Sequence, residues 1–243
     1  MADVVKKETS KKKIIVKWII RAAIVCSLCS LAFFLVSPNY TGYVIACFIW
    51  GVLFLLLAVM TIRFNGEFAV VRKGFIGEQD VNDYLCKLPE GYIVINDVVI
   101  PNGENHTAQI DHIVIGENGI FCIETKNWKG EIHGNDEVRE WQQFKRSSRG
   151  RVFAKSYYSP VKQCTNHAMA LKNIINTVGI RVYVQPVVVF TDSSVRLRVT
   201  SSVPVLKLNE LLHFITTYSS WRRFPEEERA RIRAVIMDHL INV

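Results

Sequence analysis

A β-hairpin is predicted by Gln109-Ile110-Asp111-His112-Ile113-Val114-Ile115 followed, after Gly116-Glu117-Asn118-Gly119, by Ile120-Phe121-Cys122-Ile123-Glu124-Thr125-Lys126. Both strands are rich in Ile and Val, and the segment between them is typical of a turn. A loop at Glu117-Asn118 would set Asp111 opposite Glu124, and a loop at Asn118-Gly119 would set Asp111 opposite Lys126. Because side chains alternate along a strand, Glu124 and Lys126 share one face. Either register therefore brings two acids and one lysine together.

This acidic and basic triplet has two interpretations. Two nearby carboxylates resist joint ionisation unless a cation lies between them, and oxygen ligands suit Mg²⁺ or Mn²⁺. Asp111 and Glu124 would then bind the metal, while Lys126 would orient water or offset developing charge during phosphodiester hydrolysis. The alternative is a salt-bridged hairpin on the solvent face, where each ion pair contributes about 0 to 1 kcal/mol. The triplet alone favours the salt-bridged hairpin, and its surroundings reverse that preference.

The segments around the hairpin predict an α/β domain in the order αβββαβ, with further helices at its C-terminal end. Pro89 is expected to end the first helix, and Ser159 is expected to cap the second. The stretch between the third strand and the second helix is polar and basic, and it is expected to be a loop. The expected elements are helix 77–88, strands Tyr92–Ile100, Ala108–Ile115 and Ile120–Lys126, helix 160–178 with Gly179 just past its end, strand Arg181–Phe190, and helices Leu208–Thr217 and Pro225–Ile241.

The first quarter of the chain holds two apolar stretches, Ile14 to Val36 and Tyr43 to Ile62. Each is long enough for the roughly 20 residues that cross a bilayer. The cations Lys17 and Arg21 lie in the first third of the first stretch, where they can reach the lipid headgroups. Basic residues flank the pair on both sides, so the positive-inside rule places both ends in the cytoplasm. A cleaved signal peptide is the competing interpretation, but no small-x-small cleavage site follows Val36.

The net charge of +8 comes mainly from residues 1–64, which contribute +6. The remaining chain is nearly neutral, so the overall charge is weak evidence for nucleic-acid binding. One basic cluster stands out in the second half, with aromatic residues interspersed, and it is expected to contact nucleic-acid phosphates. Nearby anionic lipid headgroups would explain the same charges. The cluster consists of Arg139, Lys145, Arg146, Arg149, Arg151 and Lys155.

Over about residues 72 to 190, the sequence strongly resembles the nuclease-related domain family, NERD, a branch of the PD-(D/E)xK nuclease superfamily. The resemblance rests on blocks in the right order: Gly77-Glu78, Gln109-Ile110-Asp111-His112, Gly119-Ile120, Glu124-Thr125-Lys126-Asn127-Trp128 and Lys129-Gly130. It implies a restriction-endonuclease-like core, metal ligands at Asp111 and Glu124, and a catalytic lysine at Lys126. It also implies assisting roles for Glu78 and Gln163. Nucleases with a Gln-x-x-x-Tyr motif carry a tyrosine four residues after the glutamine, and this chain has His167 there.

These observations predict a multi-pass protein of the inner (cytoplasmic) membrane, in contact with lipid, whose N-terminus and nuclease-like domain face the cytoplasm. Its expected activity is Mg²⁺-dependent or Mn²⁺-dependent cleavage of nucleic acid, with DNA favoured, and a homodimer would suit cutting of both strands. The alternative is a non-catalytic module that holds nucleic acid or a protein at the membrane. The expected parts are a basic tail (1–13), a transmembrane hairpin (14–64), a linker (65–76), the nuclease-like domain (77–200) and a helical extension (201–243).

Overall fold

The computed structural model describes residues 3–6 and 72–241. The two stretches predicted to cross the membrane lie outside these residues. Among the described helices, none is both long enough and apolar enough to span a bilayer.

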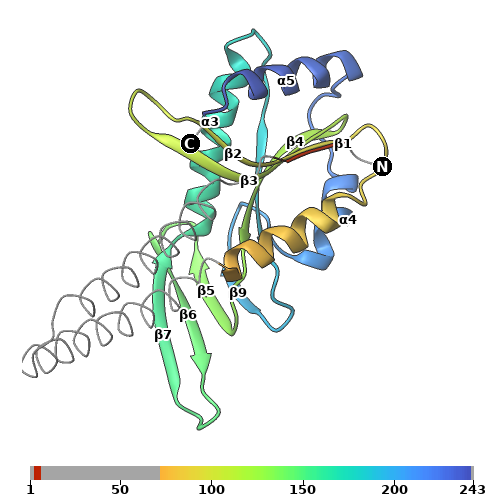
Figure 1. Cartoon of the computed structure of the whole chain (residues 1–243). Coiled ribbons are helices and arrows are strands. Elements are labelled where there is room, and N and C mark those ends of the chain that lie inside the picture. The colour runs from red at the N-terminus through yellow and green to blue at the C-terminus, as the bar shows by residue number, and fades with distance from the viewer. Residues whose placement is uncertain (1–2, 7–71, 242–243) are drawn as a thin grey trace, which may run out of the picture. The chain divides into compact units, whose positions relative to one another are not determined.

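A mixed six-stranded sheet forms the centre of the domain, with strand order β1-β2-β3-β4-β8-β10 (Figure 1). Strands β2, β3 and β4 pair antiparallel, whereas β1, β8 and β10 pair parallel to their neighbours. Every residue of β8 is buried, as expected for a parallel strand covered on both faces. The strands are β1 (Asp3–Lys6), β2 (Ile93–Pro101), β3 (Thr107–Gly116), β4 (Gly119–Lys126), β8 (Val184–Phe190) and β10 (Val205–Lys207).

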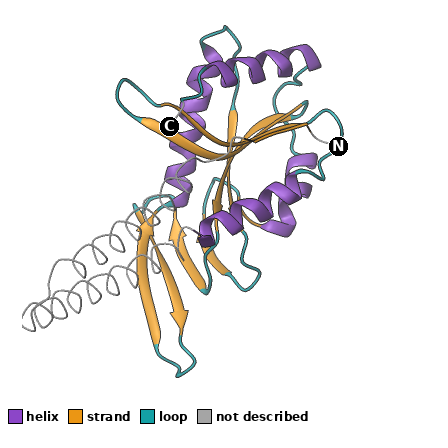
Figure 2. Cartoon of the chain, in the orientation of Figure 1, coloured by secondary structure: helices purple, strands orange, loops and turns teal. Residues whose placement is uncertain are grey.

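Helices cover both faces of this sheet (Figure 2). On one face, α3 (Pro160–Asn176) and α5 (Glu226–Asp238) pack in one apolar cluster. On the other face, the helix of residues 72–85 and α4 (Leu211–Thr217) pack in a second cluster. The result is a three-layer α/β/α arrangement in which the side chains of each strand alternate between two helical layers.

The predicted order αβββαβ is confirmed by the helix of residues 72–85, β2, β3, β4, α3 and β8. Residues 72–76, expected in a linker, are already helical, and the Asn127 side chain donates to the Lys73 carbonyl at 2.9 Å. The Ser159 hydroxyl accepts the Lys162 N–H at 3.3 Å, so it caps α3 as expected. Two helices end earlier than expected: α3 at Asn176 and α5 at Asp238.

The prediction of a loop between β4 and α3 is wrong, because this segment forms the strands β5, β6 and β7. Together with β9, which follows β8, they make a second sheet with the strand order β7-β6-β5-β9. Trp141 packs over Gly134 so closely that an added Cβ there would lie 2.4 Å from the indole ring. Strand β7 could not be predicted from the sequence, because it is almost entirely exposed and shows no apolar alternation. The strands are β5 (Glu131–Asn135), β6 (Glu140–Arg146), β7 (Val152–Tyr158) and β9 (Arg196–Thr200).

The turn between β3 and β4 settles which predicted register is formed. Gly116 pairs with Gly119, and His112 pairs with Ile123. The two-residue loop is therefore Glu117-Asn118, the register that directs Asp111 and Glu124 toward each other.

Candidate functional site

The last residues of β4 meet the first turns of α3 at a polar cluster centred on Lys126. The Lys126 ammonium donates to Glu124 Oε1 at 2.6 Å and to Gln163 Oε1 at 3.1 Å. Glu124 and Lys126 share the sheet face that α3 covers, because they are two residues apart on one strand. The Glu124 side chain is only 3% exposed and that of Lys126 is 17% exposed, so this ion pair is largely shielded from solvent.

Asp111 lies beside this cluster from the neighbouring strand. Beyond the last registered pair of β3 and β4, its Oδ2 accepts the Thr125 N–H at 2.7 Å. Burial raises the pKa of Asp111 well above its usual range, and the carboxylates of Glu124 and Glu78 raise it further. The Thr125 N–H and Lys126 act in the opposite direction, to a lesser extent. Acids from β4 and from the helix of residues 72–85 therefore both act on Asp111 of β3.

Opposite Asp111, strand β2 is locally distorted. Asn96 and Val98 pair with β3 on either side of Asp97, which adopts a φ of 51°. This left-handed conformation is uncommon for residues other than glycine and breaks the regular ladder at this point. Asp97 Oδ1 accepts from the Gln109 side chain at 3.0 Å. The strand is thus bent next to the site.

His167, which stands where the related motif carries a tyrosine, lies within this cluster. It lies one helical turn after Gln163 on α3, and its Nδ1 is 3.3 Å from Glu124 Oε2. Both of these atoms are buried and have no hydrogen-bond partner. The four-residue spacing from Gln163 was the available signal, but its proximity to Glu124 depends on how α3 packs on β4.

The donor chemistry of the cluster can be compared with the needs of a divalent metal ion. Within the described residues, no three His, Cys, Asp or Glu side chains are already arranged around a metal position. The composition fits nonetheless, because Glu124 Oε2 is buried without a hydrogen bond, and the charges of Glu124 and Glu78 both disfavour ionisation of Asp111. A hard divalent cation would satisfy the unpartnered oxygen and relieve the repulsion.

His112 points to the opposite face of the sheet. Its Nδ1 lies 2.7 Å from Asn96 Oδ1, and Asn96 Nδ2 donates to Asn82 Oδ1 at 2.7 Å. Because the Asn96 oxygen can only accept, the His112 Nδ1 carries the proton. Burial lowers the pKa of His112 to about 3. This neutral imidazole ties the helix of residues 72–85 to β2 and β3, away from the acids.

The residues that follow Lys126 anchor the end of β4. The Trp128 indole stacks on Tyr157, with ring centroids 4.5 Å apart, and meets Phe190 edge-on at 5.7 Å. Thr191 donates its N–H to the Lys126 carbonyl at 3.1 Å. Trp128 therefore joins the two sheets.

The predicted basic cluster is carried by the ordered hairpin of β6 and β7, and each of its side chains is exposed. Its positions run from just before β6 to the middle of β7: Arg139, Lys145, Arg146, Arg149, Arg151 and Lys155. Burial, followed by the charge of Lys145, lowers the pKa of Lys73 on the helix that also carries Glu78. One end of the hairpin therefore approaches the helix that contributes to the site.

Residues 73–191 match the family model of the nuclease-related domain, NERD, so a nuclease-related domain is found in this chain. This range contains every residue of the polar cluster centred on Lys126. The match suggests a nuclease-related function. An uncharacterized protein of Bacillus anthracis is 38% identical over 106 residues, covering 42% of this chain and 47% of that protein. A Streptomyces coelicolor protein named "Probable kinase PglW" is 25% identical over 154 residues, covering 61% of this chain and 9% of that protein. The chain thus spans less than half of either relative. No solved structure matches.

Proposed function

We propose that this protein is a metal-dependent nuclease that hydrolyses phosphodiester bonds, with DNA as its favoured substrate. The observation that carries the proposal is the shielded Lys126, held by Glu124 and Gln163 beside Asp111 in a nuclease-related domain. In a salt-bridged surface hairpin, the same three charged residues would lie in solvent. Here Glu124 is buried, and its Oε2 makes no hydrogen bond, with His167 Nδ1 at 3.3 Å.

Each residue of the cluster has a proposed role. Asp111 and Glu124 would hold Mg²⁺ or Mn²⁺, which when bound polarises a phosphoryl oxygen and lowers the pKa of water. The Lys126 ammonium has three N–H donors, of which Glu124 and Gln163 accept two. The third is available to a phosphate oxygen or the attacking water, where it would offset developing negative charge. Gln163 would fix the direction of the lysine, and Glu78 would add negative charge near the cation.

The exposed cations of the β6–β7 hairpin are proposed to contact the phosphates of the substrate. Between Trp141 and Tyr158 this hairpin carries five cations and no acid. Such a surface supplies sequence-independent affinity that weakens with salt. A centre with one active site per chain would cut both strands most simply as a homodimer.

Membrane anchoring is proposed from the two apolar stretches between residues 14 and 62. Strand β1 precedes these stretches and pairs parallel to β2, which follows them. This pairing is compatible with two spans, which would leave both flanks on one side of a bilayer. With the positive-inside rule, it supports a cytoplasm-facing domain held at the inner membrane, within reach of nucleic acid near the membrane.

The test is cleavage of labelled single-stranded and double-stranded DNA by the full chain in mild detergent, with Mg²⁺, Mn²⁺ or EDTA. Metal-dependent cutting that Asp111→Asn abolishes and Lys126→Ala lowers by about 10² to 10³, with an unchanged fold, is the expected result. Folded protein that binds DNA but never cuts it would favour the binding module instead. Resistance of the full chain to extraction from membranes by alkaline carbonate tests the anchor.

A further inference from the structure

The second sheet has one buried face and one face open to solvent. Alternate residues of β5 and β6 point inward, and Ile132, Trp141 and Gln143 are almost completely buried. The side chains between them therefore form the open face. On that face Glu131 registers with Phe144 of β6 on one side and with Arg196 of β9 on the other. Three strands thus contribute an aromatic, an acidic and a basic residue to one continuous row.

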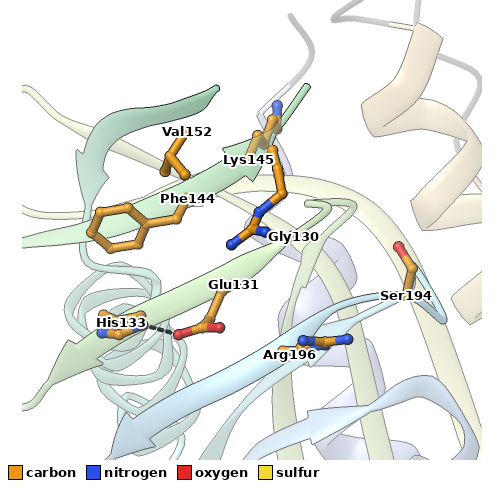
Figure 3. A pocket seen from close by; sticks show the side chains of 9 residues that line it. Gly130, Glu131, His133, Phe144, Lys145, Val152, Ser194 and Arg196 are labelled. Atoms are coloured by element: carbon orange, nitrogen blue, oxygen red, sulfur yellow. Dashed lines mark hydrogen bonds and ion pairs between the residues drawn. The ribbon is translucent and has the colours of Figure 1, made fainter. Parts of the chain in front are cut away.

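This row lines a hollow of about 630 Å³. Figure 3 shows Phe144 and Lys145 on one side, Arg196 on the opposite side, and Glu131 and His133 between them. Arg146 is a further lining residue, next to Lys145 at the end of β6. The hollow therefore combines cations on two opposite walls with an aromatic ring.

The positive charge of the hollow exceeds its negative charge. Lys145, Arg146 and Arg196 line it, and Glu131 is the acid among its lining residues. Glu131 already accepts from His133 Nε2 at 2.5 Å and lies 4.0 Å from Arg198 Nε. The hydrogen bond from His133 leads the effects that lower the pKa of Glu131. Because Glu131 is compensated by these neighbours, the three cations retain attraction for an anion.

The aromatic part of the hollow is fixed in place. Phe144 meets the His133 ring edge-on, with centroids 5.0 Å apart, and both side chains are at least partly exposed. The strand that carries Phe144 is held on its other face by the buried Trp141 and Gln143, whose amide donates to the Lys129 carbonyl at 2.8 Å. A partly exposed ring on a firmly paired strand, beside several cations, is the combination on which unpaired bases stack.

We propose that this hollow is a binding subsite for single-stranded nucleic acid. Phosphates would contact Lys145, Arg146 and Arg196, and a base would stack on Phe144. The base must be unpaired, since bases within a duplex present their faces to each other and not to a protein ring. Any role of the subsite in cleavage rests on the proposed nuclease function. Binding at the subsite does not depend on that function.

The position of the hollow suits a strand that also reaches Lys126. Gly130, at its edge, follows Lys126 by four residues, so the two Cα atoms lie within about 14 Å. The Arg196 N–H donates to the Gly130 carbonyl at 2.9 Å, which fixes β9 to the same edge. Single-strand-binding grooves of OB folds contact about 4 to 16 nucleotides, which sets the scale for such a site. One short strand would therefore occupy the subsite and reach the candidate site together.

The experiment is fluorescence anisotropy of a labelled 16-nucleotide single strand and of the matching duplex, with the full chain in mild detergent and EDTA. Phe144→Leu removes the ring and keeps an apolar side chain, so it should weaken single-strand binding about 10-fold and leave the salt dependence unchanged. Arg196→Gln should weaken binding and reduce the slope of log K against log salt by about 0.7. Arg231→Gln, an exposed arginine on α5, removes the same charge elsewhere and should change neither quantity.

The proposal is overturned if Phe144→Leu and Arg196→Gln bind the single strand like the wild type, or if they weaken duplex binding to the same extent. It is also overturned if these variants lose binding only to vesicles of anionic phosphatidylglycerol. Cleavage separates the subsite from the proposed function. If the wild type binds through the hollow and never cuts, the subsite proposal stands and the nuclease proposal fails. If both variants cut like the wild type, the nuclease proposal stands and the subsite proposal fails.

Discussion

Lys126 Nζ donates a hydrogen bond to Gln163 Oε1 over 3.1 Å, although the two residues are 37 positions apart. One lies at the end of a central strand and the other in the first turns of the helix that covers it. Because Glu124 holds the same ammonium, Lys126 has two fixed partners in a shielded setting. Gln163 of α3 therefore orients the ammonium group that Lys126 of β4 provides.

If Gln163 positions the lysine, removing each residue should have a different effect. Lys126→Ala should lower single-turnover cleavage by about 10² to 10³, the scale for losing one stabilising donor. Gln163→Ala should lower it about 10-fold, because Glu124 still holds the ammonium. Asn173→Ala, which removes an exposed amide from the same helix, should cut normally. Equal losses in both Lys126→Ala and Gln163→Ala would contradict the positioning role.

Asp111→Asn should stabilise the metal-free protein while abolishing cleavage. The pKa of Asp111 is raised in the folded state, so its ionised form at neutral pH opposes folding. Relief of about 1 kcal/mol would raise the melting temperature by about 2 to 4 °C in EDTA. Added Mn²⁺ should stabilise the wild type and not the variant.

The control for this measurement is Asp83→Asn, which neutralises an exposed acid on the helix of residues 72–85. It should leave both the melting temperature in EDTA and the response to Mn²⁺ close to those of the wild type. A lower melting temperature for Asp111→Asn in EDTA would show that the acids do not repel one another as inferred.

His167→Tyr should retain cleavage, whereas His167→Ala should reduce it about 10-fold. A tyrosine hydroxyl at this position can donate to the buried, unpartnered Glu124 Oε2, which lies 3.3 Å from His167 Nδ1. Alanine provides neither an imidazole nor a hydroxyl next to that oxygen. Single-turnover rates of the two variants at saturating metal provide the comparison, and equal activity in both would remove His167 from the site.

The protein should lose stability as the pH falls from 6.5 toward 3, partly through His112. The unfolded chain binds a proton at the ordinary histidine pKa of 6.5, whereas the pKa of folded His112 is lowered to about 3. The unfolded state therefore binds more protons across this window, at about 1.4 kcal/mol per pH unit, or about 2 kcal/mol at pH 5. Urea unfolding at pH 7.5 and pH 5 should show this component in the wild type and not in His112→Gln. The same pH dependence in both proteins would contradict the assignment.

Much of the central sheet was predictable from local sequence. The strands around Asp111 and Glu124 are runs of Ile and Val bounded by turn residues, and Ser159 marks the start of α3. The second sheet was not predictable. Its edge strand β7 is exposed almost throughout, so no alternation distinguishes it from a loop. Its β5 and β9 pair although Glu131 and Arg196 are far apart along the chain.

The candidate site, too, was predictable from local sequence only in part. Alternation along β4 by itself determined that Glu124 and Lys126 share a face, and the turn limited the position of Asp111 to two registers. Only the tertiary structure decided between those registers, brought His167 to Glu124, and set Phe144 in a row with Arg196. Strand periodicity and turn chemistry depend on residues adjacent in the chain. Which helix face meets which strand depends on burying apolar surface across the whole domain, and that is decided only when the chain is folded.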